Sequence, residues 1–467
     1  MTAGSLIREV MVYEYLYRHL VFPLYDKFIK RRGVYNYYRE FAGRGYLPPR
    51  ELERMRRQKL NRLVRYSYEN VPYYRDMFDR EKVQVDEVFD IDGLRRCGIT
   101  TSKVILRESP LSIFSNLYDR SDLINTSTSG STGEPFLVHM SYDNWCRRMA
   151  LKYRSEEWFG KPIGTPATII WGHKPDLSGL ARIKERLYWR FQNYRFLSAF
   201  NVGEESLLEY LKIISRSRSR FLESYVTVVY ELARVIDEHG LEPPPLDGIV
   251  IGAERLFDFQ RKQIEESFKC PVYNRYGSTE FSNIASECRE RKGLHINADC
   301  LWVEVVDEDD RPVTGRPGQI VVTDLHNFAM PLIRYRTGDV GVMSEKACPC
   351  GRTFPMLEDV MGRASDTLVT ESGRKMHDMF FLWKLSRVPG INRFQVVQDS
   401  LNHIYVNIVH DGSVDQEDTT DRVKKALEAL AEYNISVTTR YVNDIPTSRA
   451  GKTSFFRSDI NRKDRTG

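Results

Sequence analysis

The chain of 467 residues lacks several features that mark common protein classes. No run of apolar residues is long enough to span a bilayer, and the first residues lack the apolar core and small-residue cleavage site of a signal peptide. The seven cysteines are an odd number in a chain without a secretion signal, which argues against a disulfide framework. We therefore expect a cytoplasmic protein.

An excess of charge of one sign is also missing. Lys and Arg number 69 against 64 Asp and Glu, so the net charge is +5, a small value that is spread along the chain. A nucleic-acid-binding surface requires a concentrated basic patch, so we expect no nucleic acid as partner. Repeats and low-complexity tracts are absent as well. The length then predicts a large enzyme-sized protein of two or more domains, while the oligomeric state is left open.

A run rich in hydroxyls and glycine, residues 125–135, is the most informative stretch of the sequence. Its glycines, Gly130 and Gly133, permit positive φ and close backbone approach, as a loop around a polyphosphate requires. The alternative is a Ser/Gly linker, but the run is short and lies between apolar stretches. It is not a Walker loop, because no Gly-Lys-Ser/Thr ends it. The hydroxyls that would add donors to the backbone N–H groups belong to Ser129, Ser131 and Thr132.

Further motifs follow this loop in a fixed order. They are Gly252-Ala253-Glu254, Tyr276-Gly277-Ser278-Thr279-Glu280, Tyr335-Arg336-Thr337-Gly338-Asp339, Gly362-Arg363-Ala364-Ser365-Asp366 and a lone Gly451-Lys452. Together they resemble the signature segments of the adenylate-forming superfamily of acyl-CoA synthetases, peptide-synthetase adenylation domains and luciferases. The likeness is greatest to the phenylacetate–CoA ligase-like branch, including relatives from capsule-polysaccharide loci. Each motif is weak alone, but the ordered set is specific.

Helical and strand-like runs alternate beyond about residue 140, which is typical of an α/β fold. The resemblance implies a large multi-sheet N-terminal domain, residues 1–361, whose first 80 residues are mainly helical. It also implies a small mobile C-terminal domain, residues 362–467, with a hinge near 362–366. The patterns after the hinge predict a small α+β module with strands at 393–397, 403–409 and 435–442 and a helix at 423–433.

Residues 5–30 are rich in aromatic, aliphatic and basic side chains at helical spacing. An amphipathic helix of this kind can rest on a membrane surface or pack its aromatic face on the large domain. We expect packing, with an interruption at Pro23, and no membrane contact. A second helix is predicted over residues 49–67.

The resemblance implies two reactions at one site. A substrate carboxylate attacks the α-phosphate of ATP to give an acyl-adenylate and pyrophosphate, and an acceptor then takes the acyl group. Glu280 would bind Mg²⁺, Thr279 would meet the α-phosphate, Asp339 would bind the ribose, and Lys452 would neutralise charge during adenylation. The remaining nucleotide-binding candidates are Gly252, Ala253, Glu254, Tyr276, Gly277, Ser278 and Arg363.

Departures from the family concern the acyl pocket and the acceptor. The family's Gly-Tyr-Pro-Ser loop is replaced by residues 224–227, the hinge carries Ser365, and the glycine-rich loop of the pantetheine tunnel is replaced by residues 372–377. The acceptor therefore stays open between CoA, a carrier-protein thiol, an amino sugar and an amino acid. Aromatic core packing is the alternative for the candidate acid-pocket residues, which are Trp171, His173 and Tyr225.

A separate set of residues has the composition of a metal site. Cys288, His295, Cys348 and Cys350 would supply three thiolates and one imidazole, a closed tetrahedral set of the kind that structural Zn²⁺ takes. Cys300 is a spare candidate. Unrelated buried cysteines are the alternative.

Two other functions remain open from the sequence. One is a nucleotidyltransferase that stops after transferring AMP to a cofactor or metabolite. The other is an inactive scaffold of the same fold, against which the presence of Glu280, Asp339 and Lys452 argues.

Overall fold

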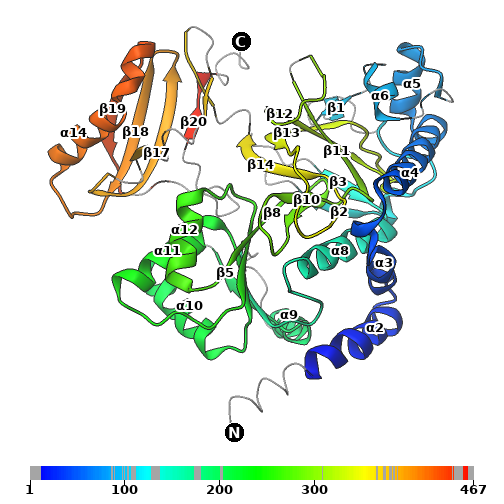
Figure 1. The fold of residues 1–467 in the computed structure, drawn as a ribbon, viewed down its shortest axis with the longest axis horizontal. Coiled ribbons are helices and arrows are strands. Elements are labelled where there is room, and N and C mark those ends of the chain that lie inside the picture. Colours follow the sequence, from blue (N-terminus) through cyan, green and yellow to red (C-terminus); the bar gives the residue numbers. More distant parts are fainter. Residues whose placement is uncertain are drawn as a thin grey trace. The chain divides into compact units, whose positions relative to one another are not determined.

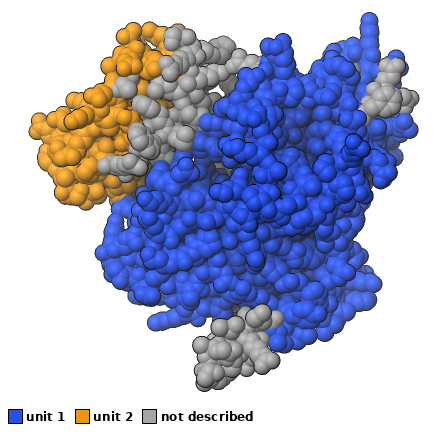
Figure 2. Space-filling model, in the orientation of Figure 1, with its two compact units in different colours: residues 1–361 blue, residues 362–467 orange. Residues whose placement is uncertain are grey.

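The chain forms two compact units, residues 1–361 and 362–467 (Figures 1 and 2). The molecule is described from a computed structural model. The residues that the structure describes are 12–85, 88, 90–96, 98, 100–102, 105–106, 112–127, 137–172, 180–199, 203–307, 309–363, 367–371, 375–377, 381, 384–385, 388–443, 445 and 456–460.

Unit 1 begins with a helical segment that runs through Pro23. Two π-helical turns, η1 (Tyr17–Val21) and η2 (Tyr25–Ile29), flank α2 (Phe22–Leu24). The predicted interruption is wrong, because the wider hydrogen-bond spacing of π turns accommodates a residue without an N–H. Tyr17 and Phe22 are buried in a cluster with residues of α8 (Tyr142–Glu157), as expected for a helix that packs on the large domain.

The next helices of unit 1 include two that begin with proline. Proline favours the first helical turn because its missing N–H has no partner there in any case. These two helices are α4 (Pro49–Asn70), which extends the predicted 49–67, and α5 (Pro72–Arg80). The other early helices are α3 (Val34–Phe41), η3 (Arg44–Tyr46), α6 (Ile91–Arg96) and η5 (Arg120–Asp122).

A 12-stranded mixed sheet is the centre of unit 1, in the order β11-β12-β13-β14-β10-β9-β8-β7-β6-β4-β5 with β1 paired to β13. One half is parallel and alternates with helices, which confirms the α/β pattern. Its strands are β4 (Ala167–Trp171), β5 (Tyr194–Ser198), β6 (Phe221–Ser224), β7 (Gly248–Gly252) and β8 (Val272–Ser278). The helices are α8, α9 (Leu180–Phe191), α10 (Glu204–Arg216), α11 (Val226–Glu238) and α12 (Asp258–Phe268). Every residue of β6 and β7 is buried, as parallel strands covered on both faces require.

The other half of the sheet is mainly antiparallel. Its strands are β1 (Thr101–Ser102), β9 (Ser282–Glu287), β10 (Leu294–Ile296), β11 (Leu301–Val306), β12 (Pro317–Asp324), β13 (Tyr335–Met343) and β14 (Met356–Arg363). A separate hairpin pairs β2 (Ile124–Ser127) with β3 (Leu137–Met140), in a register that sets Ser127 opposite Leu137.

Unit 2 contains a four-stranded sheet in the order β19-β18-β17-β20. The three predicted strands are present, but the helix begins earlier than predicted, because Asp415 caps it by accepting from the Glu417 N–H. Its last turns form a separate 3₁₀ helix. The elements are β15 (Thr367–Val369), β16 (Lys375–His377), β17 (Ile391–Ser400), β18 (His403–His410), α14 (Gln416–Ala426), η6 (Glu428–Tyr433), β19 (Ser436–Tyr441) and β20 (Phe456–Ser458).

Candidate active site

The parallel half of the sheet collects most of the predicted site at one edge. β4, β6, β7 and β8 run in the same direction, so their carboxyl ends meet. Ligands of open α/β sheets bind outside these ends. Trp171, Gly252 and Ser278 are the last residues of three of the strands, and Tyr225 follows the fourth.

Two aromatic side chains form one wall of this edge. The rings of Trp171 and Tyr225 stack with centroids 4.2 Å apart and an interplanar angle of 26°. The backbone N–H of Gly172 donates to the Tyr225 hydroxyl at 3.3 Å. The wall agrees with an acid pocket but serves core packing equally well, since Tyr225 is 3% exposed.

The segment after β7 is strained and anchored. Ala253 has φ +66°, a left-handed conformation that residues with a Cβ adopt at a cost. The Glu254 carboxylate accepts from the Thr227 N–H at 2.8 Å and from the Thr227 hydroxyl at 2.9 Å. Thr227 lies in the first turn of α11, so Glu254 satisfies the open N–H groups of that helix. The sequence analysis missed this anchoring role.

Gly277 brings two backbone segments unusually close. A Cβ at this position would lie 2.2 Å from the carbonyl oxygen of Ser282, so only glycine fits. The turn between β8 and β9 contains Thr279 and Glu280. Next to it, the Ser278 hydroxyl is buried and has no hydrogen-bond partner among the described residues. This tight turn therefore holds a buried hydroxyl whose partner is not supplied by the described residues, a feature that calls for an explanation.

Tyr276 and Asp339, from motifs 63 residues apart in the sequence, meet in the structure. The Tyr276 hydroxyl donates to Oδ2 of Asp339 at 2.8 Å. Three strands separate β8 from β13 in the sheet, so the contact requires the sheet to curl. Burial and the neighbouring Asp339 carboxylate hold the pKa of Tyr276 well above its usual value, so the hydroxyl keeps its proton.

Glu280 has a partner that the sequence analysis did not name. The Tyr335 hydroxyl donates to Oε1 of Glu280 at 3.1 Å, and Glu280 is only 9% exposed. Tyr335 begins β13, and Asp339 lies four residues later on the same strand. The position of Tyr335 inside the Tyr-Arg-Thr-Gly-Asp motif was the feature of the sequence that could have pointed to this contact.

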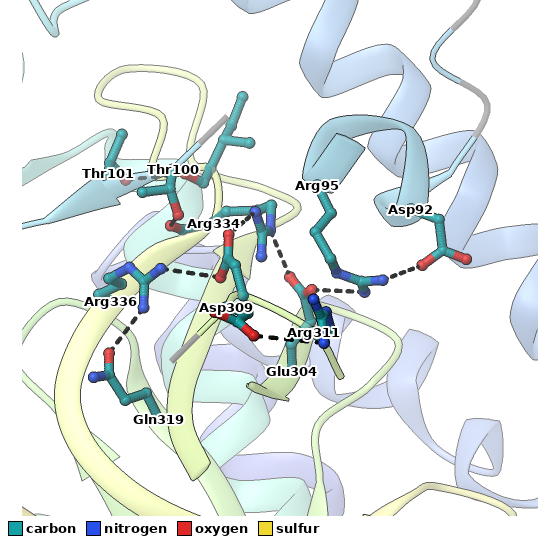
Figure 3. A network of polar contacts seen from close by, with 12 residues as sticks. Asp92, Arg95, Thr100, Thr101, Glu304, Asp309, Arg311, Gln319, Arg334 and Arg336 are labelled. Carbon is teal, nitrogen blue, oxygen red and sulfur yellow. Dashed lines mark hydrogen bonds and ion pairs between the residues drawn. The ribbon is translucent and has the colours of Figure 1, made fainter. Parts of the chain in front are cut away.

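A partly buried charge network fixes the start of β13 (Figure 3). Arg334 is fully buried and pairs with Glu304 at 3.1 Å and with Asp310 at 2.9 Å. Arg336 also pairs with Asp310 and donates to Gln319 at 2.8 Å. Because side chains alternate along a strand, Tyr335 points to the side opposite to these two arginines, where its hydroxyl meets Glu280.

A second arginine contact lies close to the end of unit 1. Arg255, which follows Glu254, pairs with Asp359 at 2.7 Å and donates to the carbonyl of Met361 at 3.1 Å. The segment after β7 is thus tied to the last residues before the boundary between the units.

The candidate metal ligands come together on the antiparallel half. The ligand atoms of Cys288, His295, Cys348 and Cys350 lie within 4.8 Å of one another. Sγ of Cys288 is 3.6 Å from Sγ of Cys348, and Sγ of Cys350 is 3.3 Å from Nε2 of His295. The sulfur–sulfur distance excludes a disulfide, whose bond is about 2.05 Å long. Cys300 does not join the group; it is buried in the cluster around Tyr17 and Phe22.

Burial dominates the protonation of two members of this cluster, His295 and Cys288. It lowers the pKa of His295 to about 4, with Arg352 adding to the effect, so the imidazole is neutral, which is its metal-binding form. It raises the pKa of Cys288 to about 12. The pKa of Cys350 is instead lowered, because burial, which would raise it, is outweighed by hydrogen bonds from Arg352 and from the neighbouring cysteines.

Several predicted site residues lie outside the described residues. Ser127 and Leu137 pair at the ends of β2 and β3, so the hydroxyl-rich loop joins the two strands of a hairpin. Arg363 is the last residue of β14. The candidates outside the described part of the chain are Ser129, Gly130, Ser131, Thr132, Gly133, His173, Ser365 and Lys452.

Comparison with known proteins agrees with this arrangement. A solved structure of 2-hydroxyisobutyryl-CoA ligase, in the postadenylation state with an acyl-AMP, superposes with a TM-score of 0.71 at 16% identity, covering 90% of this chain and 94% of the other. The fold is therefore that of adenylate-forming ligases, with a small α+β C-terminal domain, as predicted.

Comparison of the sequence with known proteins identifies relatives more similar to this chain than the solved structures are. The model of the CapK C-terminal domain matches residues 368–459. Protein CapK of Staphylococcus aureus is 23% identical over 95% of this chain and 97% of its own length. A phenylacetate-coenzyme A ligase of Thermus thermophilus is 28% identical over 69% of this chain and 73% of its own length. The chain therefore resembles CapK over nearly its whole length and phenylacetate-coenzyme A ligases over about 69% of its length.

Proposed function

We propose that the protein activates a carboxylic acid with ATP to an acyl-adenylate and then transfers the acyl group to CoA or to another thiol or amine. The pair of contacts that join Tyr276 to Asp339 and Tyr335 to Glu280 carries this proposal. They bring the two acidic motif residues to one edge of the sheet, next to the ends of β4, β6 and β7.

In the first reaction the acid's carboxylate oxygen bonds to the α-phosphorus of ATP, and pyrophosphate leaves with the electrons of the broken bond. The protein's contribution is alignment and charge neutralisation. Asp339 would accept from the ribose hydroxyls, while Tyr276 fixes one of its oxygens. Thr279, in the tight β8–β9 turn, would meet the α-phosphate.

Glu280 fits a magnesium ligand. Its carboxylate is oriented by a neutral donor, the Tyr335 hydroxyl, rather than by a cation that would compete with the metal. Mg²⁺ prefers a carboxylate together with water and phosphate oxygens, and it would neutralise phosphate charge. The loop that joins β2 to β3 would hold the β- and γ-phosphates through Ser129, Gly130, Ser131, Thr132 and Gly133.

Unit 2 would complete the site. Lys452 would supply an ammonium between the carboxylate and the α-phosphate during adenylation, and movement about residues 362–366 would withdraw it for acyl transfer. If so, Lys452→Ala should abolish most acyl-adenylate formation while transfer from a supplied acyl-adenylate stays nearly intact. Equal loss in both reactions would indicate a structural role.

The cluster of Cys288, His295, Cys348 and Cys350 would hold a structural zinc. Zn–S bonds of about 2.3 Å in a tetrahedron place the sulfurs about 3.8 Å apart. The observed 3.6 Å between Cys288 and Cys348 fits this requirement. Because all four positions come from the protein, the ion would fasten the turn after β9 to the β13–β14 loop rather than take part in the chemistry.

The acceptor and pathway follow from the relatives. The similarity to phenylacetate-coenzyme A ligases supports CoA as the acceptor. A carrier-protein thiol, an amino sugar and an amino acid are the alternatives. The resemblance of the motifs to relatives from capsule-polysaccharide loci is the ground for proposing a role in polysaccharide biosynthesis. We also propose that the protein is cytoplasmic.

ATP–pyrophosphate exchange over a panel of carboxylic acids tests the first reaction. The proposal predicts exchange that depends on one class of acid and on Mg²⁺. AMP that ends on a stable, non-acyl product would instead establish a nucleotidyltransferase, and failure to bind ATP in calorimetry would establish an inactive scaffold.

A further inference from the structure

Large apolar side chains are concentrated on the outside of the first helical segment. Seventeen such residues are exposed among the described residues, and nine of them fall within residues 12–29. We call them the N-terminal outer face: Val12, Tyr13, Tyr15, Leu16, Leu20, Val21, Leu24, Phe28 and Ile29. Monomeric soluble proteins rarely expose so many large apolar side chains together, and such a surface is typical of an interaction site.

Part of this face is a continuous stripe. Val12, Leu16, Leu20, Leu24 and Phe28 recur every fourth residue, and each is between 48% and 65% exposed. Residues four apart are neighbours on a helix, and the wide π turns keep them close to one line. The helix thus has two apolar faces, one buried and one exposed.

The helix is held firmly on unit 1 by its inner side. Tyr17 and Phe22 are 1% and 0% exposed, and the ring of Phe191 at the end of α9 contacts Tyr25 at 4.3 Å between centroids. Glu14 pairs with Arg220 at 2.8 Å. The outer face is therefore presented by a fixed helix and not by a loose tail.

The acidic and the exposed basic side chains lie on different sides of the helix. The only acidic residues within 12–31 are Glu14 and Asp26, and both are buried and paired with arginines. The exposed charged side chains of the same stretch are all cationic: Lys27, Lys30 and Arg31. An apolar stripe flanked by cations and tyrosines complements an anionic lipid surface.

Helix α9, which lies next to the N-terminal helix, also exposes apolar and cationic side chains. Ile183 and Leu187, four residues apart, are 56% and 62% exposed. Lys184, Arg186 and Arg190 are exposed on the same helix. The ammonium of Lys30 lies 5.5 Å from the ring centroid of Tyr188, which places α9 next to the N-terminal segment, and both lie at the lower edge of Figure 1.

We propose that the N-terminal outer face binds the interface of an anionic bilayer, with the helix lying in the plane of the membrane. No helix among the described residues is long and apolar enough to cross one. A second copy of the chain is the less favourable occupant, because a two-fold interface through this face would bring the lysines and Arg31 of both copies together.

Flotation with lipid vesicles tests the proposal on the full chain. The protein should float with phosphatidylglycerol-rich vesicles and only weakly with pure phosphatidylcholine. Leu20→Glu with Leu24→Glu should reduce vesicle binding at least about tenfold, because two apolar contacts are replaced by charges that the lipid repels. Lys27→Gln with Lys30→Gln should remove mainly the preference for phosphatidylglycerol.

Leu117→Glu is the matched control, because Leu117 is 67% exposed but lies far from residues 12–29 in the sequence. It should leave vesicle binding unchanged, and all variants should keep the wild-type melting temperature. Wild-type protein that does not float, or a Leu20/Leu24 variant that floats like wild type, would overturn the proposal. A wild-type dimer in light scattering that the same variant converts to monomer, without any vesicle binding, would assign the face to a second copy.

Discussion

The two halves of the large sheet bring residues to the candidate site by different means. In the parallel half, Trp171 and Gly252 reach the edge because strand ends coincide. In the antiparallel half, Tyr335 and Asp339 reach it because Arg334 is fixed by the carboxylates of Glu304 and Asp310. The backbone therefore positions the site residues of the parallel half, whereas side-chain ion pairs position those of the antiparallel half.

This difference predicts unequal sensitivity to substitution. A residue placed by the backbone tolerates changes in its neighbours, whereas a residue placed through hydrogen bonds and ion pairs moves when one partner is removed. Substitutions in and around β13 should therefore disturb catalysis more than substitutions of similar size at the ends of β4 to β7.

The largest effect is expected at Glu280, where the halves join. Glu280→Gln keeps the size and the acceptor oxygen for Tyr335 but removes the charge that would bind Mg²⁺. Acid-dependent pyrophosphate exchange should fall by about 100-fold or more, the scale of losing a preorganised electrostatic partner. Glu266→Gln, at a side chain that is 63% exposed, is the control. Exchange within a few-fold of wild type would show that Glu280 does not hold the metal.

The second largest effect is expected from disruption of the metal cluster. Cys348→Ser should remove the zinc, about one ion per chain by elemental analysis of chelator-free protein, and lower the melting temperature by on the order of 5 °C. Cys300→Ala, at a buried cysteine outside the cluster, should retain the metal. Wild-type protein that contains no zinc but is folded and active would show that the cluster is not a structural zinc site.

A smaller effect is expected from Tyr276→Phe, which deletes the donor to Asp339. A hydrogen bond to a charged group contributes about 1.5–3 kcal/mol, so KM for ATP should rise roughly tenfold while the fold persists. The raised pKa of Tyr276 means that the folded protein holds this proton more tightly than the unfolded chain, in which tyrosine titrates near about 10. The bond is therefore complete below that pH, and KM should not change through Tyr276 between neutral pH and about 10. A KM for ATP that rises in this range because Tyr276 loses its proton would contradict the assignment.

The smallest effect is expected at Glu254 in the parallel half. Glu254→Gln removes a charge from the N-terminus of α11 and should cost about 0.5–1 kcal/mol of unfolding free energy with little change in KM for ATP. Glu238→Gln, near the opposite end of the same helix, should be neutral or slightly stabilising. A raised KM at unchanged stability would instead assign Glu254 to the adenine pocket.

Sequence could predict what depends on local pattern. The alternation of helices and strands predicted the α/β fold. The ordered motifs predicted Gly252 and Ser278 as site residues, and the structure places both at strand ends. The spacing and chemistry of Cys288, His295, Cys348 and Cys350 were enough to suggest that they meet.

Contacts across the sheet could not be predicted in this way. Arg334 would be expected at the surface, and its burial depends on Glu304 and Asp310 from other segments. Likewise, Thr227 and Tyr335 act through partners that only the folded sheet brings near. For the N-terminal helix, the sequence analysis treated packing and membrane contact as alternatives and favoured packing, because apolar periodicity alone does not tell how much of the apolar surface the domain covers.

The most direct test of the central claim follows the oxygen that bonds to phosphorus. An acid labelled with heavy oxygen in its carboxylate is incubated with the protein, ATP, Mg²⁺ and an acceptor, and the products are analysed by mass spectrometry. Formation and transfer of an acyl-adenylate predict AMP that carries one labelled oxygen. Unlabelled AMP together with a product that retains the AMP group, or label found in free phosphate, would contradict the account.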